Sequence, residues 1–244
     1  MSKVPEVTFV FWIIKIAATT LGETGGDAVS MSMNLGYLTS TAIFALLFCL
    51  SVYSQVRSVI FHPIAYWVTI IATTTLGTTL ADFVDRSMGI GYAGGSLLLL
   101  TFLILSLFAW YKTLGSVAIS TVTSPKEEAF YWTTIMFSQT LGTALGDWTS
   151  DSAGFGYAGS AVLFSTLLGI LVMIYYFTNI SRTIIFWSAF ILTRPLGAVV
   201  GDFLDKPIER GGLDLSRFSS SALLLIFIVG CIYFLPQRAA KKLH

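Results

Sequence analysis

Charged residues are scarce in this chain of 244 residues, at only 11% of the total, whereas hydrophobic residues make up 55%. A soluble domain carries about 25% charged residues, so this composition excludes an ordinary soluble fold. The mean hydropathy of +0.79 indicates an integral membrane protein. The net charge of +1 gives no indication of a nucleic-acid partner, and none is expected.

Cysteine and histidine are also rare. The two cysteines, Cys49 and Cys231, lie in apolar runs, and the two histidines stand apart from each other and from the cysteines. A disulfide framework, a zinc site and a haem site therefore have no support. No nucleophile with an adjacent base is recognisable either, so we expect neither an enzyme nor an obligatory cofactor.

One stretch occurs four times. In each copy a Trp is followed nine residues later by Leu-Gly and fifteen residues later by Asp, and the copies begin 55, 65 and 55 residues apart. The copies are Trp12–Asp27, Trp67–Asp82, Trp132–Asp147 and Trp187–Asp202. This constant register indicates an internal repeat. Small residues spaced four apart, such as Gly22 and Gly26, predict close approach of helix backbones.

Eight apolar segments, each near the length of about 20 residues that crosses a bilayer, follow one another along the chain. They predict an all-α integral membrane protein with eight transmembrane helices. Two crossings per repeat give four parallel-oriented helical hairpin repeats around a pseudo-four-fold axis. The repeats lie at approximately 8–57, 63–112, 128–178 and 183–236 within a single membrane domain, 1–244. The oligomeric state stays open.

The copies of Leu-Gly-x-x-x-Gly/Ala-Asp, with Gly-Tyr at 36–37, 91–92 and 156–157, support a resemblance. The chain resembles bacterial membrane-anchored proteins built from a repeat of unknown function, number three-four-seven. The resemblance implies four tandem repeats in a bacterial inner membrane and brings no activity. A weaker similarity is to manganese and calcium exchangers with a Glu-x-Gly-Asp motif. Only their paired acids carry over, because Glu23 and Asp27 are one residue too far apart and inverted repeats are absent.

Lysine and arginine predict the orientation. Eight lie in the termini and the loops between repeats, and four lie in the loops within repeats. The positive-inside rule therefore places both termini, represented by Lys3 and His244, in the cytoplasm. Ten of the 13 acids lie toward the opposite face. A negative field of this kind attracts cations.

The motif aspartates are the main candidates for function. An ionised acid at the end of an apolar segment needs a partner, and a bound cation is one. The structural alternative is that these residues only cap the outer helical turn. We expect an ion-binding and metal-binding set of Glu23, Asp27, Asp82, Asp147 and Asp202.

Helical spacing places residues four and seven positions earlier on the same face as each aspartate. This adds hydroxyl ligands to the predicted set: Thr20, Thr75, Thr78, Thr140 and Thr143. A second acid follows in three repeats, at Asp85, Asp151 and Asp205, where a role in closing the loop is favoured.

Two basic residues lie within the first helices of repeats one and four. Lys15 can reach the cytoplasmic headgroups or act as an internal counter-charge. Arg194 is deeper, precedes the helix-kinking Pro195 and requires an acidic partner. We expect this partner to be Glu23 or Asp27, and the charge pattern of the repeats favours Asp27.

The leading hypothesis is a transporter of a small hard cation, divalent and for example Mn²⁺, with proton or ion-pair exchange at the acids. An all-oxygen ligand set suits such ions. The expected partners are the lipid bilayer and this cation. One alternative is a transporter of a small organic solute. Another is a non-transporting scaffold or sensor whose acids only pair with Arg194 and Lys15.

Overall fold

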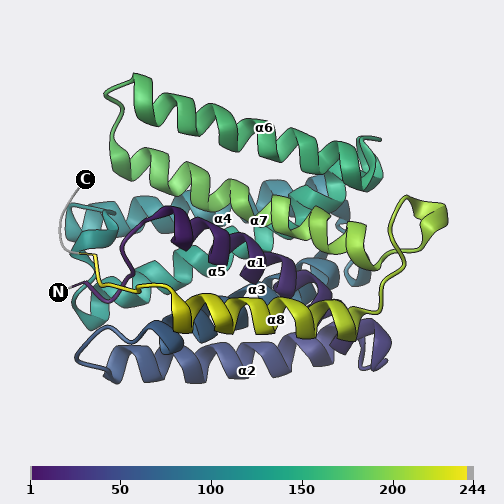
Figure 1. Cartoon of the computed structure of the whole chain (residues 1–244), viewed down its shortest axis with the longest axis horizontal. Coiled ribbons are helices and arrows are strands. Elements are labelled where there is room, and N and C mark those ends of the chain that lie inside the picture. The colour runs from purple at the N-terminus through teal and green to yellow at the C-terminus, as the bar shows by residue number, and fades with distance from the viewer. Residues whose placement is uncertain (1, 241–244) are drawn as a thin grey trace.

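The computed structural model describes residues 2–240 and is all-helical over that range, apart from an isolated β-bridge between Pro5 and Ala239 (Figure 1). The eight α-helices are α1 Phe9–Asp27, α2 Gly36–Arg57, α3 Pro63–Asp82, α4 Gly91–Leu114, α5 Pro125–Asp147, α6 Gly156–Phe177, α7 Arg182–Asp205 and α8 Arg217–Phe234. Each repeat contributes two helices, as the sequence predicted. Helix α7 continues through Pro195.

The first helices of the four repeats form an inner ring. Helix α1 packs against α3 and α7, and α5 packs against the same two helices, so the contacts close into a cycle. The second helices lie outside this ring. Each packs mainly on the first helix of the following repeat: α2 on α3, α4 on α5, α6 on α7, and α8 on α1.

This arrangement differs from the predicted hairpins, in which the two helices of one repeat would pack on each other. Each inner helix already packs against two other inner helices. The outer helix of a repeat therefore packs on the inner helix of the next repeat and not on its own. The repeats are thereby interlocked. The chain ends complete the interlocking at one end of the molecule, where Glu6 N–H donates to the Arg238 carbonyl at 2.8 Å and Ala240 N–H to the Val4 carbonyl at 2.9 Å (Figure 1).

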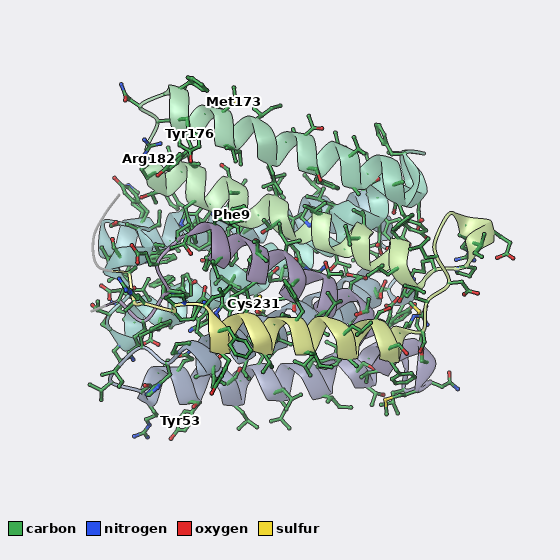
Figure 2. The ribbon with its side chains drawn as sticks, in the orientation of Figure 1. Phe9, Tyr53, Met173, Tyr176, Arg182 and Cys231 are labelled. Atoms are coloured by element: carbon green, nitrogen blue, oxygen red, sulfur yellow. The ribbon has the colours of Figure 1, made fainter. Side chains whose placement is uncertain are left out.

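The distribution of polarity is that of a membrane-like helical protein. Apolar side chains such as Tyr53, Met173 and Tyr176 point outward from the outer helices (Figure 2), while charged and hydroxyl side chains of the inner ring are buried. Six helices are long and apolar enough to cross a membrane, namely α2, α3, α4, α6, α7 and α8. Helices α1 and α5 do not meet that criterion. Both belong to the inner ring, where most of their polar residues are buried.

The repeated glycines explain how the inner helices approach one another. A Cβ atom at Gly26 would lie 2.9 Å from Thr78 Cβ on the next helix, and one at Gly77 would lie 2.9 Å from the backbone carbon of Gln139. Gly142 and Gly146 meet α7, and Gly197 and Gly201 meet α1 in the same way. Small residues therefore form contacts at all four inner interfaces, as the spacing predicted.

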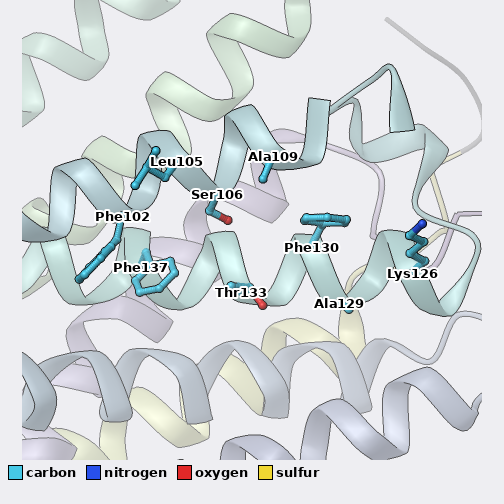
Figure 3. Close-up of a pocket in the computed structure, with 9 residues that line it drawn as sticks. All are labelled: Phe102, Leu105, Ser106, Ala109, Lys126, Ala129, Phe130, Thr133 and Phe137. Carbon is cyan, nitrogen blue, oxygen red and sulfur yellow. The ribbon is translucent and has the colours of Figure 1, made fainter. Parts of the chain in front are cut away.

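The outer surface carries a shallow groove between α4 and α5, lined mainly by Phe102, Phe130 and Phe137 with Lys126 at one end (Figure 3). It contains none of the repeated aspartates. The polar chemistry of this chain is instead concentrated inside the ring.

We expect Gly77→Ala to destabilise the protein by about 1–3 kcal/mol, because the added methyl group would clash with backbone atoms of α5. Gly169→Ala is the matched control, since a Cβ atom there meets nothing within 4 Å on helix α6. That change should be neutral or stabilise by up to about 1 kcal/mol. Thermal melting of the purified variants in detergent measures both. Equal melting temperatures would contradict close backbone packing at Gly77.

Candidate functional site

The four motif aspartates form one layer at the end of the inner ring remote from the termini. Asp27, Asp82, Asp147 and Asp202 occupy equivalent positions of α1, α3, α5 and α7, and each is at most 3% exposed. The first three are each followed by a single π-helical turn, and none of these three side chains caps it. Capping therefore does not explain these acids.

Two basic side chains join the layer into two pairs. The guanidinium of Arg86 lies 2.9 Å from Asp82 Oδ1 through Nε and 3.1 Å from Asp147 Oδ2 through Nη2. The ammonium of Lys206 lies 2.5 Å from Asp27 Oδ2 and 3.0 Å from Asp202 Oδ1. Each base follows its own aspartate by four residues and reaches the aspartate of the next repeat around the ring.

Lys206 sits in the more negative of the two pairs. Asp205 Oδ1 lies 3.9 Å from its ammonium, and Asp205 Oδ2 accepts a 2.8 Å bond from Arg217 Nε. Burial alone would lower the pKa of Lys206, but the carboxylates of Asp202, Asp27 and Asp205 outweigh it and hold that pKa well above its ordinary value. The ammonium is therefore charged at neutral pH.

Arg194 lies one layer deeper, fully buried at the centre of the ring. Its Nη2 donates to Glu23 Oε2 at 3.0 Å, Thr78 Oγ1 at 2.6 Å and Thr143 Oγ1 at 2.5 Å. These partners come from repeats one, two and three, so one side chain of repeat four connects the whole ring. Of the two acids expected to pair with Arg194, the structure selects Glu23. The favoured pairing with Asp27 is wrong, because Asp27 lies one turn further out, at Lys206.

Acids outnumber bases in this buried region. Six carboxylates take part in its ion pairs, those of Glu23, Asp27, Asp82, Asp147, Asp202 and Asp205, against four basic side chains, those of Arg86, Arg194, Lys206 and Arg217. If all are ionised, two negative charges stay uncompensated. Burial of such charge is costly without a further cation or protons.

Two groups of three carboxylates are close enough to share an ion. One oxygen each from Glu23, Asp147 and Asp202 lies within 4.8 Å of the others, and the same holds for Asp27, Asp202 and Asp205. We call the first group the central trio and the second the outer trio. The central trio joins repeats one, three and four. Lys206 occupies only the outer trio.

The remaining predicted ligands are divided by the structure. Thr78 and Thr143 face Arg194. By contrast, Thr20, Thr75 and Thr140 are buried but donate to carbonyls of their own helices, those of Ile16, Ile71 and Met136. The residues that meet at the centre of the ring lie four or eight positions before a motif aspartate, as Thr78 and Arg194 do. Residues seven positions before an aspartate point less directly toward the centre.

The secondary acids have three different environments. Asp205 belongs to the outer trio. Asp85 is buried against Gly95 of α4 with neither carboxylate oxygen hydrogen-bonded. Asp151 is exposed, and its Oδ2 accepts a 3.4 Å bond from the Tyr92 hydroxyl.

Toward the termini, polar groups in the ring lack partners. The Lys15 ammonium is fully buried, lies 4.2 Å from the centre of the Phe190 ring and has no hydrogen-bond partner among the described residues. It therefore does not reach the membrane surface. The side-chain amide nitrogen and oxygen of Gln139 likewise have no hydrogen-bond partner in the part of the chain that the structure describes. Beyond them, the Tyr66 and Tyr131 hydroxyls meet at 2.7 Å within an aromatic cluster that closes this end of the ring.

The sequence places Arg86, Lys206 and Arg217 in the loops within repeats, so it did not predict them as site residues. A usable signal was present. Asp82–Arg86 reads Asp-Phe-Val-Asp-Arg and Asp202–Lys206 reads Asp-Phe-Leu-Asp-Lys, so repeats two and four share a base four residues after the motif aspartate. This spacing places acid and base on one helical face.

Comparison with known proteins is consistent with this internal symmetry. The family model described as Repeat of Unknown Function (DUF347) matches four times, at residues 10–60, 65–116, 130–181 and 185–238. The resemblance predicted from the repeated motif is thereby confirmed. No curated protein and no solved structure matches the chain.

We expect Arg194→Ala to destabilise the protein by about 3–5 kcal/mol, since it leaves Glu23 buried without its charge partner. Adding Glu23→Gln should recover part of this loss, whereas adding Asp27→Asn should not, because Asp27 pairs with Lys206 instead. A double-mutant cycle measured by thermal melting separates the two cases. Strictly additive effects of Arg194→Ala and Glu23→Gln would contradict their coupling.

Proposed function

The chain belongs to the family of the Repeat of Unknown Function (DUF347), whose description names no activity. From the geometry of the site, we propose that it transports a small hard divalent cation across a membrane. The central trio of Glu23, Asp147 and Asp202 would bind the ion. Mn²⁺ is the first ion to test. The chain is then a transporter and not an enzyme.

The membrane arrangement is part of this proposal. All eight helices cross the bilayer, with α1, α3, α5 and α7 arranged about a pseudo-four-fold axis in a bacterial inner membrane. Helices α1 and α5 are included because they close the same ring of contacts as α3 and α7, which are apolar enough to span. Both termini are cytoplasmic, on the side richer in lysine and arginine.

The observation that carries the proposal is the buried central trio, in which each carboxylate has a basic partner and all three lie close enough to share one ion. Three carboxylates from three repeats converge within 4.8 Å, in a region where acids exceed bases by two charges. A divalent cation supplies that charge. Carboxylate and hydroxyl oxygens favour hard ions, and no thiolate or imidazole lies in the trio.

The surroundings of the trio suit a carrier that is closed at both ends. On the terminal side the Tyr66–Tyr131 cluster covers the ring, and on the other side the ion pairs of Arg86 and Lys206 cover it. Arg86 is 32% exposed, so the cover on this side consists of ion-paired side chains next to the surface. Entry from the outer face therefore needs smaller rearrangement than exit past the aromatic cluster.

Arg194 has a natural role in such a carrier. When the ion leaves, the guanidinium already bonded to Glu23 keeps part of the trio neutralised. A scaffold whose acids only pair with Arg194 and Lys15 accounts less well for the ring. Lys15 pairs with no acid, and buried polar atoms of Gln139 stay unsatisfied, which is costly unless another state or a water supplies partners.

Topology provides one test. Reporter fusions at Lys3 and after His244, which lies outside the described residues, should report the cytoplasm. A reporter inserted at Glu209, between α7 and α8, should report the opposite side. The reason is the distribution of basic residues between the two sets of loops. A periplasmic signal at Lys3 would contradict the orientation.

Transport provides the direct test. Purified protein in proteoliposomes should take up Mn²⁺, measured against Mg²⁺, Ca²⁺, Zn²⁺ and Na⁺. Asp147→Asn should lower the initial rate about tenfold or more, a change of at least about 1.4 kcal/mol, because it removes one of three charged ligands. Asp151→Asn is the matched control. It removes the same charge from the same repeat, at an exposed position outside the trio.

Two results would overturn the proposal. One is the absence of uptake for every cation together with no cation-dependent thermal shift in detergent, which is the behaviour of a scaffold or sensor. The other is equal uptake by the Asp147→Asn and Asp151→Asn variants, which would place the binding site elsewhere.

A further inference from the structure

We infer that Lys206 is a tethered competitor of the transported cation: its ammonium occupies the outer trio when that cation is absent and leaves it when the cation binds. The inference rests on the proposed function and adds to it a regulation of the same site.

The ammonium lies where a cation held by the outer trio would lie, next to the central trio. It lies 2.5 Å from Asp27 Oδ2, 3.0 Å from Asp202 Oδ1 and 3.9 Å from Asp205 Oδ1, all within 4.0 Å of one nitrogen. Asp202 belongs to both trios. A cation that draws Asp202 toward Glu23 and Asp147 therefore weakens the hold on Lys206.

The outer trio offers more oxygen than a lysine uses. Only the contact with Asp27 Oδ2 has hydrogen-bond geometry. Within residues 2–240, Asp27 Oδ1, Asp202 Oδ1 and Asp205 Oδ1 accept no hydrogen bond, and each of these residues is at most 6% exposed. Buried carboxylate oxygens that lie near a cation without accepting a hydrogen bond suit an ion with many oxygen ligands better than they suit three N–H donors.

Lys206 can leave without unfolding its loop. Its backbone N–H donates to the Asp202 carbonyl at 2.9 Å, and its own carbonyl accepts from Asp214 N–H at 2.9 Å. The loop is further held by Leu213 N–H on the Phe203 carbonyl and Leu215 N–H on the Leu204 carbonyl. With the backbone fixed in this way, exchange requires only rotation of a four-carbon side chain at the edge of the ring.

Arg86, the equivalent base of repeat two, is less suited to exchange. Its planar guanidinium engages two carboxylates through different nitrogens, Nε to Asp82 and Nη2 to Asp147, and Nη1 donates to the Tyr37 hydroxyl at 3.2 Å. A fork held at three points is displaced less easily than a single ammonium. Arg86 and Lys206 occupy equivalent positions of repeats two and four, but only Lys206 is held loosely enough for a cation to displace it.

The test compares Mn²⁺-dependent thermal shifts of the purified full chain in detergent. Lys206→Met should melt lower than wild type without Mn²⁺. It should also bind Mn²⁺ about tenfold more tightly, as expected if Lys206 occupies the site about 90% of the time. Lys206→Arg, which keeps the charge, should stay near the wild-type affinity. Arg210→Met is the matched control, because it removes an exposed charge from the same loop.

A second measurement uses the wild-type chain and does not depend on a variant folding. The reactivity of Lys206 toward an acylating reagent, followed by mass spectrometry, should rise when Mn²⁺ is added. Unchanged reactivity under conditions where wild type shows a Mn²⁺-dependent thermal shift would overturn the inference.

The remaining outcomes separate the two proposals. Wild-type binding with an unchanged affinity of Lys206→Met overturns the competition and leaves the transport proposal standing. An equal gain in Lys206→Met and Arg210→Met also overturns it, since a general charge effect would then suffice. No Mn²⁺-dependent shift and no uptake by any of these proteins overturns the proposed function, and the inference with it.

Discussion

The close approach of the four inner helices is the constraint on which the rest of the structure depends. Because Gly22, Gly77, Gly142 and Gly197 have no side chain, the next helix comes near enough for its backbone or Cβ atoms to fill the space of a methyl group. Only at this separation do carboxylates from different repeats come within ion-pair distance of one another. The same small residues that pack the ring therefore concentrate its charge.

The backbone repeats four times, but the charge pattern repeats twice. The spacing between copies is 55, 65 and 55 residues, so repeats one and two form one unit and repeats three and four another. The bases that follow a motif aspartate belong to the second repeat of each unit, and both Arg86 and Lys206 bridge toward the next unit. The interfaces within a unit, between Asp27 and Asp82 and between Asp147 and Asp202, have no such bridge among the described residues.

Sequence reasoning found the helices, the repeat and the burial of the motif acids, because each of these is a local property that a short pattern determines. The packing of α2 on α3, and not on α1, was not accessible, since it depends on which side of an inner helix stays free once the ring has closed. Glu23 and Asp27 were both candidate partners of Arg194, and the favoured one, Asp27, was wrong. The two acids lie one helical turn apart, and ideal helical spacing does not determine which of them a long side chain reaches. Lys206 and Arg86 were assigned to loops, although their four-residue spacing from an aspartate contained the relevant signal.

Charge compensation sets the order of events at the site. Arg194 is fully enclosed and touches repeats one, two and three, so moving it would disturb the whole ring. Arg86 is fixed by two carboxylates and a tyrosine. Lys206 has a compact ammonium with one hydrogen bond, and it lies among carboxylate oxygens that accept no hydrogen bond from the described residues. In the proposed transporter, a cation that enters this layer from the end remote from the termini would therefore replace the ammonium at lower cost than either guanidinium, and would first meet the acids of repeats four and one.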